Sequence, residues 1–141
     1  MLRKRRRILG EEHPHTLMSM NNLANTHLAQ GRTGEAAALL EEVLQKRSRI
    51  LGEEHPDTLR SMNNLANTYQ AQGRMGEAAA LGEEALQKQR RILGEEHPDT
   101  LMSMANLANT YSDQGRTGEA AALREEVLQK RRRDPPSPGQ S

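Results

Sequence analysis

The sequence predicts an all-α solenoid, in which duplicated helical hairpins stack along one axis. The hexapeptide Leu-Gly-Glu-Glu-His-Pro occupies residues 9–14, 51–56 and 93–98, so its copies lie 42 residues apart. A fixed period of this size is typical of a repeat array. The chain has no Phe, Trp or Cys, which excludes a disulfide framework and a core built on large rings. Ala, Leu and Met must therefore pack closely spaced helices, and each module needs to bury only the faces toward its neighbours.

The first helix of each module is expected to begin at a proline, because proline lacks only an N–H that the first helical turn leaves unpaired. These prolines are Pro14, Pro56 and Pro98. In the second module the apolar residues lie at helical spacing on one face: Leu59, Met62, Leu65, Ala66 and Tyr69. The helix is expected to end near Gln72, with Gly73 as the left-handed cap residue.

The second helix of that module is expected to run over about 77–93, antiparallel to the first because the turn between them is short. Its inner face would hold Ala78, Leu81, Ala85 and Leu86. Thr33 and Thr117 are expected to cap the second helices of the other modules, since a threonine hydroxyl can accept from the first free N–H groups. Met75 has no such hydroxyl, and its helix should lose ~1 kcal/mol.

The repeat predicts five segments along the chain. They are a partial repeat forming a helical stub (1–10), three complete repeats (11–52, 53–94 and 95–133) and a tail (134–141). The tail has three prolines and no apolar residue, so we expect it to be disordered. A chain that begins inside a repeat and has no separate capping helix is expected to expose packing surfaces at both ends.

The module resembles the tetratricopeptide repeat (TPR), in the longer form found in kinesin light chains. The resemblance rests on the runs Asn64-Leu65-Ala66-Asn67-Thr68-Tyr69, Gly73-Arg74, Glu77-Ala78-Ala79, Ala85-Leu86, Leu93-Gly94 and His55-Pro56-Asp57, and on their counterparts in the other modules. It covers nearly the whole chain. It implies three tandem helix-turn-helix repeats that form a right-handed superhelix.

Three positions depart from the family pattern. His27 stands where the other modules have tyrosine, and Gly82 and Arg124 stand where the first module has Leu40. The family usually fills this last position with a large apolar residue. A glycine within a helix also costs ~1 kcal/mol relative to alanine, so these departures predict looser packing within the same fold.

The resemblance further implies a concave groove, lined by the first helices, that holds peptides. Peptide-contacting positions fall on the side of each first helix away from its apolar stripe. In this sequence they are Met18, Asn21, Asn22, Asn25, Leu28, Arg60, Asn63, Asn64, Asn67, Gln70, Met102, Asn106, Asn109, Ser112 and Asp113.

Two rows of asparagine stand out among these positions. One row is Asn22, Asn64 and Asn106, and the other is Asn25, Asn67 and Asn109. An asparagine amide is both donor and acceptor, so a row could pair with the backbone of an extended peptide and show little sequence preference. Alternatively, the amides bond to neighbouring helices and hold the stack in register. Both interpretations stay open, and one row could serve each role.

The variable groove positions would determine specificity. Met18 and Leu28 would make one end apolar, Arg60 would place a cation in the middle, and Asp113 an anion at the far end. This pattern predicts a peptide with an acidic residue near its centre.

The sequence argues against metal binding, cofactors and enzyme activity. His13, His55 and His97 occur once per module, too far apart to share one ion, and are interpreted as residues at the helix entry. The Glu-Glu pairs at 11–12, 53–54 and 95–96 also repeat with the module, whereas a catalytic acid pair needs one special environment. No nucleophile elbow, phosphate-binding glycine loop or triad pattern is present.

Partners other than proteins are also disfavoured. The basic runs at 3–7 and 130–133 could contact nucleic acid, but no aromatic residues are placed for base stacking, and the net charge is only +1. No apolar run approaches the ~20 residues of a membrane span. We therefore predict a cytoplasmic, non-enzymatic scaffold that binds a protein or peptide ligand. The alternatives are a structural module that self-associates through its uncapped ends, by head-to-tail stacking or helix exchange, and an excerpt of a longer array.

Overall fold

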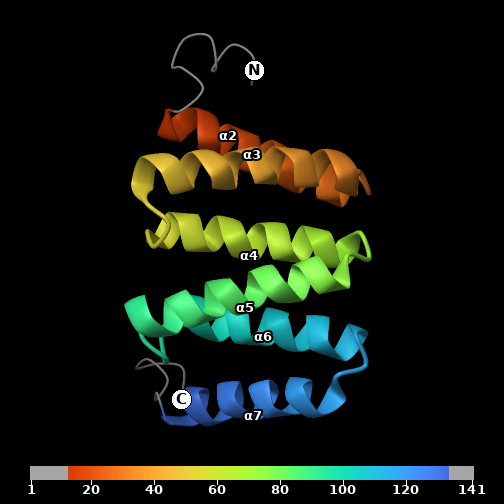
Figure 1. The fold of residues 1–141 in the computed structure, drawn as a ribbon, viewed down its shortest axis with the longest axis vertical. Helices are drawn as coiled ribbons and strands as arrows, with labels where there is room; N and C mark the ends of the chain where they lie inside the picture. The colour runs from red at the N-terminus through yellow and green to blue at the C-terminus, as the bar shows by residue number, and fades with distance from the viewer. Residues whose placement is uncertain (1–12, 134–141) are drawn as a thin grey trace, which may run out of the picture.

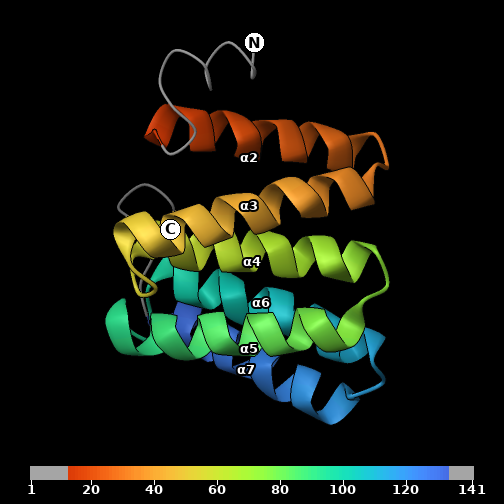
Figure 2. The same ribbon diagram turned by 45° about the horizontal axis from the view of Figure 1, so that its top comes forward.

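The structure is a computed structural model that describes residues 13–133, and this part of the chain forms six α-helices. They are α2 (Pro14–Ala29), α3 (Thr33–Leu51), α4 (Pro56–Ala71), α5 (Met75–Ile92), α6 (Pro98–Asp113) and α7 (Thr117–Arg133). The helices lie across the long axis of the molecule and follow one another from α2 to α7 (Figure 1). A second view separates α2 from α3, which overlap in the first (Figure 2).

The helices form three hairpins, α2–α3, α4–α5 and α6–α7, and each helix packs against the next one in sequence. Helix α4 also contacts α6. The all-α solenoid predicted from the repeat is therefore confirmed. Each predicted repeat holds one hairpin, while its boundary residues stay a prediction. The predicted stub over 1–10 and the predicted tail over 134–141 lie outside the described residues.

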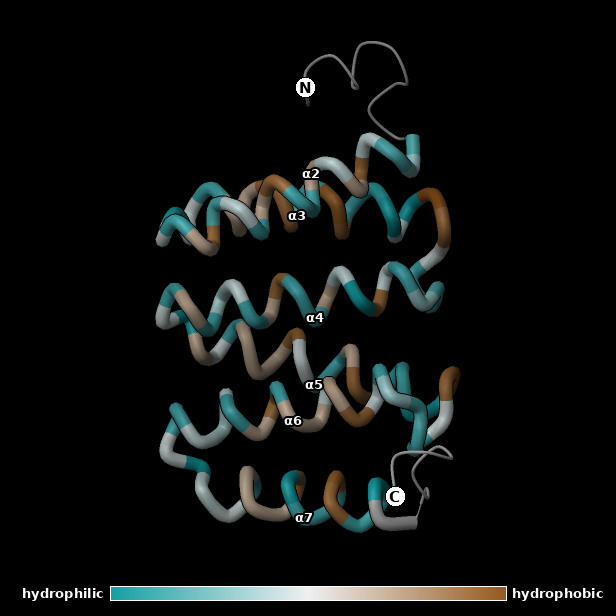
Figure 3. The backbone as a smooth tube through the Cα atoms, turned by 180° about the vertical axis from the view of Figure 1, so that it is seen from behind, coloured by the Kyte–Doolittle hydropathy of each residue, from teal (hydrophilic) through white to brown (hydrophobic). Residues whose placement is uncertain are grey.

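The apolar side chains of the described residues gather in four clusters. One cluster joins α5, α6 and α7 around Met104 and Leu107, and another joins α2 to α5 around Leu40 and Leu65. Apolar and polar segments alternate along the helices (Figure 3), as expected when each helix buries only part of its circumference. The stability of the stack therefore depends on contacts between neighbouring helices.

The first helices begin at the predicted prolines, and the histidine before each proline caps the helix. In each module the histidine Nδ1 accepts a hydrogen bond from the backbone N–H two residues later. The donors are His15 for His13 (3.1 Å), Asp57 for His55 (3.0 Å) and Asp99 for His97 (3.0 Å). The sequence predicted a residue at the helix entry but not this use of the imidazole.

The turn inside each hairpin is shorter than predicted. The N–H of Gly73, whose φ is +80°, donates to the Gln70 carbonyl (3.0 Å), and the N–H of Arg74 donates to the Tyr69 carbonyl (2.8 Å). This is the Schellman arrangement that a left-handed glycine permits. Arg74 then serves directly as the N-cap of α5, so the second helix begins at Met75 rather than near Glu77.

The predicted threonine caps are therefore wrong. Thr33 is the first residue of α3 and Thr117 the first residue of α7. The N-cap of α3 is Arg32, and its side chain makes no capping bond. Met75 occupies the equivalent first position of α5, so the loss of a cap that we predicted for it does not arise.

The looser packing predicted at Gly82 is not observed. Gly82 is buried, and a Cβ atom added to it would lie 3.3 Å from Leu107 Cδ1. The hollow beside it measures only about 10 Å³. Leu40, at the equivalent position of α3, is fully buried. The missing side chain is compensated by a close approach of α5 to the Leu107 side chain of α6.

Candidate functional site

A hollow of about 190 Å³ lies between the first helices α4 and α6. Its lining comprises Arg60, Asn63, Asn64, Asn67, Gln89, Asp99, Met102 and Asn106. All of these except Gln89 and Asp99 belong to the groove positions predicted from the sequence. The hollow thus brings together predicted residues from two successive modules.

The remaining predicted residues lie on the same three helices but do not line this hollow. On α2 they are Met18, Asn21, Asn22, Asn25 and Leu28, on α4 Gln70, and on α6 Asn109, Ser112 and Asp113. Met18 and Met102 are exposed, at 53% and 61%. Leu28 is half-buried and packs against the cluster around Leu40, so it gives the groove less apolar surface than we predicted.

Gln89 of α5 forms the floor of the hollow and was missed by the sequence analysis. Its side chain is fully buried, and its Oε1 accepts from Ser103 Oγ and from Asn63 Nδ2, the latter at 3.3 Å. The Asn63 amide also donates to Ser103 Oγ. The Gln89 Nε2 has no hydrogen-bond partner among the described residues. The sequence did carry one indication that this position is unusual, because Gln89 stands where the other modules have Arg47 and Arg131.

Two asparagines of α4, Asn63 and Asn64, connect this helix to the first helices of the neighbouring modules. Asn63 links α4 to α6 through Ser103, and Asn64 Nδ2 donates to Asn21 Oδ1 of α2 at 3.4 Å. The row of Asn25, Asn67 and Asn109 is exposed. Within it, the Asn109 Oδ1 accepts from the Arg124 guanidinium at 3.1 Å. Asn64 therefore helps to hold neighbouring helices in register. The row of Asn25, Asn67 and Asn109, called the outer asparagine row below, has its amides at the surface.

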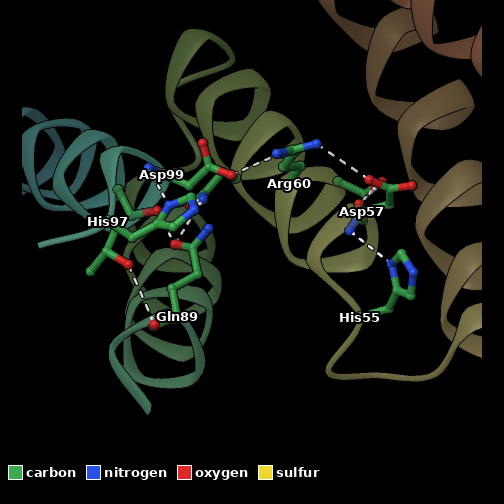
Figure 4. Close-up of polar contacts among 10 residues, drawn as sticks. His55, Asp57, Arg60, Gln89, His97 and Asp99 are labelled. Atoms are coloured by element: carbon green, nitrogen blue, oxygen red, sulfur yellow. Dashed lines mark hydrogen bonds and ion pairs between the residues drawn. The ribbon is translucent and has the colours of Figure 1, made fainter. Parts of the chain in front are cut away.

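Arg60, which we predicted as a cation in the middle of the groove, pairs with two carboxylates of the protein itself. Its Nε donates to Asp99 Oδ2 at 2.9 Å, and another guanidinium nitrogen donates to Asp57 Oδ1 at 3.3 Å (Figure 4). Two carboxylates thus already neutralise this cation. The expectation of an acidic peptide residue opposite Arg60 loses support, because such a residue would share the guanidinium with two aspartates.

The far end of the groove is also occupied by an internal contact. Asp113 Oδ2 accepts from Gln70 Nε2 at 2.8 Å, and Gln70 Oε1 accepts from Thr110 Oγ1 at 3.2 Å. A neutral amide does not compensate the charge of Asp113. Together, α2, α4 and α6 carry three aspartates against one arginine, so their surface is acidic.

The described residues contain no group of three or more His, Asp or Glu side chains that could hold a metal ion. No helix among them is long and apolar enough to cross a membrane.

Comparison with known proteins supports the interpretation of the repeat. Two family models, both described as tetratricopeptide repeat, match residues 62–133 and 16–57. The comparison with curated proteins finds no match.

Similar folds occur among solved structures. The nearly identical TPR-like repeats of a Podosopora anserina protein assigned as a kinesin light chain are 36% identical and superpose with a TM-score of 0.83, covering 96% of this chain and 64% of that one. A single-substitution variant of those repeats is 35% identical with a TM-score of 0.84, covering 94% and 63%. BtubC (BKLC) from P. vanneervenii shares the fold at 22% identity and a TM-score of 0.85, covering 99% and 57%. The chain thus spans less than two thirds of these relatives.

Repeats of this kind mediate protein–protein interactions. The period, the helical hairpins, the family models and the solved relatives all agree. The chain belongs to the tetratricopeptide repeat family and is of the kinesin-light-chain-like type.

Proposed function

We propose that the chain is a non-enzymatic, cytoplasmic scaffold that binds an extended segment of a partner protein along α2, α4 and α6. The observation that carries the proposal is the hollow of about 190 Å³ between α4 and α6, which gathers amide side chains from two modules. A groove whose walls repeat with the module suits an extended chain, because the backbone of such a chain also repeats.

The outer asparagine row supports backbone recognition. Asn25 and Asn67 are exposed, and no side-chain partner of their amides is present among the described residues. Each amide can donate to a peptide carbonyl and accept from a peptide N–H. Such contacts are independent of the peptide's side chains, so the affinity would vary little with sequence.

Specificity would come from apolar and charged neighbours of that row. Met102 lines the hollow, and Met18, its equivalent two modules earlier, is exposed. Methionine adapts to varied apolar side chains. Asp113 leaves a negative charge at the far end, while Arg60 is neutralised. We therefore expect a segment with apolar side chains and few acidic residues.

A peptide-array screen tests the proposal, with Asn67→Ala as the test variant and Gln129→Ala as a matched control on the exposed surface of α7. One lost hydrogen bond of ~0.5–1.5 kcal/mol should weaken binding roughly 3- to 10-fold. The loss should be similar for all bound peptides, and the control should bind as wild type does. Unchanged binding by Asn67→Ala, or no peptide bound by wild type, would refute the groove as the site.

Self-association is a second candidate function, and the exposure of one leucine favours it. Leu128 on α7 is 53% exposed, whereas Leu86, its equivalent on α5, is 6% exposed. A second copy that covered α7 would bury this leucine. Light scattering over a concentration series tests this, and a mass that stays monomeric at every concentration would exclude it.

A further inference from the structure

Two further hollows repeat on the side of the stack formed by α3, α5 and α7. The first outer hollow, of about 470 Å³, lies between α3, α4 and α5. The second outer hollow, of about 390 Å³, lies between α5, α6 and α7. Their volumes are ordinary for ligand sites. Neither shares a lining residue with the hollow between α4 and α6, so they form a surface separate from the groove.

The floor of the first outer hollow is apolar. Leu65 of α4 is buried there, and Leu44 of α3 and Leu81 of α5 are half-buried and pack against the clusters beneath. The Tyr69 ring and Ala80 complete it. Such a floor favours a ligand with an apolar part over a simple ion, because an apolar group removes the floor from contact with water.

The rim of the first outer hollow is acidic. Its charged lining residues are Glu41, Glu77 and Glu84. Glu77 pairs with Arg74 at 2.6 Å, and Glu84 pairs with Lys88 at 2.9 Å. Glu41 differs from both, because the hydrogen-bond donor that it meets is a neutral group.

That donor is the Tyr69 hydroxyl, which lies 2.6 Å from Glu41 Oε2. Burial and this bond to Glu41 raise the pKa of Tyr69 to about 12, so the phenol keeps its proton at neutral pH. The Arg74 guanidinium lies 4.1 Å from the centre of the Tyr69 ring and donates its hydrogen bonds to Glu77 and Gln72. Arg74 also attracts Glu41 electrostatically, but it donates no hydrogen bond to it. The Glu41 carboxylate thus lies at the edge of an apolar floor with a neutral hydroxyl as its hydrogen-bond donor.

The second outer hollow repeats the floor but not the charge. Glu83 accepts from the Tyr111 hydroxyl, but the Arg116 guanidinium also lies 3.8 Å from Glu83. The lining further includes Arg90, which donates to Glu126. A cation entering this hollow would meet the Arg90 guanidinium in its lining, whereas no arginine or lysine of the described residues lines the first outer hollow, which is therefore the better site.

We propose that the first outer hollow receives a lysine side chain from a basic amphipathic segment of a partner protein. The lysine stem would lie on Leu44 and Leu81, and its ammonium would meet Glu41. Lysine suits such a place because its long apolar stem buries while its charged end stays near water. This surface works independently of the groove, so the proposal holds whether or not the groove binds a peptide.

Methyl NMR of leucine-labelled protein tests the proposal with a defined probe, a synthetic amphipathic helix of leucine and lysine. The comparison peptide carries glutamine in place of every lysine. The lysine peptide should shift the methyl signals of Leu44 and Leu81, and the glutamine peptide should not. Glu41→Gln should weaken binding roughly 5- to 10-fold, since a charge-assisted contact is lost. Glu83→Gln, the matched control one module away, should change it less than twofold.

A second variant keeps the test independent of charge. Ala80 is exposed at the edge of the hollow, so Ala80→Phe should fill it and abolish the shifts while the fold persists. Asn67→Ala, a groove variant, should leave them unchanged. Equal binding of both peptides, lysine-peptide shifts that leave the Leu44 and Leu81 methyl signals in place, or a wild-type dimer in light scattering whose formation shifts the Leu44 signal would each overturn the proposal.

Discussion

Leu86 and Leu128 offer a direct measure of how much one module stabilises the next. They occupy the same position in successive modules, on α5 and α7, but Leu86 is 6% exposed and Leu128 is 53% exposed. Replacing a buried leucine by alanine removes three carbon atoms, worth about 2–3 kcal/mol in transfer free energy at ~0.8 kcal/mol for each buried methylene. Leu86 lines an open hollow, so the cavity term that often enlarges such losses should be small.

Leu128→Ala should cost about 1 kcal/mol, because solvent already contacts half of the side chain. Urea unfolding followed by far-ultraviolet circular dichroism gives both losses from the change in the midpoint and the slope. The expected difference between the variants is therefore about 1–2 kcal/mol. Helix propensity changes equally in both variants and cancels in the comparison.

Equal losses would refute the reasoning, since two leucines of such different exposure would then contribute the same amount. A larger loss for Leu128→Ala would indicate that α7 is covered in solution, which would favour self-association. The same measurement at two protein concentrations separates these outcomes, because a dimer gains stability with concentration.

Three further predictions concern local features. His55→Ala should lower the unfolding free energy by ~1 kcal/mol through the lost N-cap, whereas His55→Asn should retain it in the same urea assay. Hydrogen bonds from Arg90 above all lower the pKa of Glu126 from 4.5 to about 2, so its stabilisation is present above pH 4.5 and disappears as the pH falls to about 2. Comparing acid titrations of wild type and Glu126→Gln should show a difference on the order of 1 kcal/mol at pH 7, since solvent screens a partly exposed pair, and none near pH 2. Gly82→Ala should raise the thermal midpoint, because the helix gains up to ~1 kcal/mol and the Leu107 methyl 3.3 Å away lies at the end of a flexible side chain; a lower midpoint would show that this methyl cannot yield.

The fold was predictable because its signals are local and repeated. Pro56 begins α4 and Gly73 ends it, and each acts through its own backbone preference. The 42-residue period then fixes the same hairpin three times over. The threonine caps failed for a local reason too, since the arginine after the left-handed glycine, Arg32 in the first module, is itself the N-cap of the next helix.

The site was less predictable because its contacts join residues distant in sequence. The bond between Arg60 and Asp99 spans 39 positions, and that between Asn63 and Ser103 spans 40. Helical spacing assigns each side chain to a face but does not say which partner it meets across the stack. Gln89 was missed for the same reason, because its role depends on burial beneath the side chains of α4 and α6.

Methyl NMR of methionine-labelled protein tests the central claim, binding along the first helices, most directly. Met18 and Met102 report on the groove, Met20 and Met104 on the core, and Met75 on the start of α5, outside the groove. A peptide recovered from the array should shift the methyl signals of both Met102 and Met18. It should leave the signal of Met75 unchanged. A bound peptide that shifts Met75 while both groove methionines stay still would contradict the account.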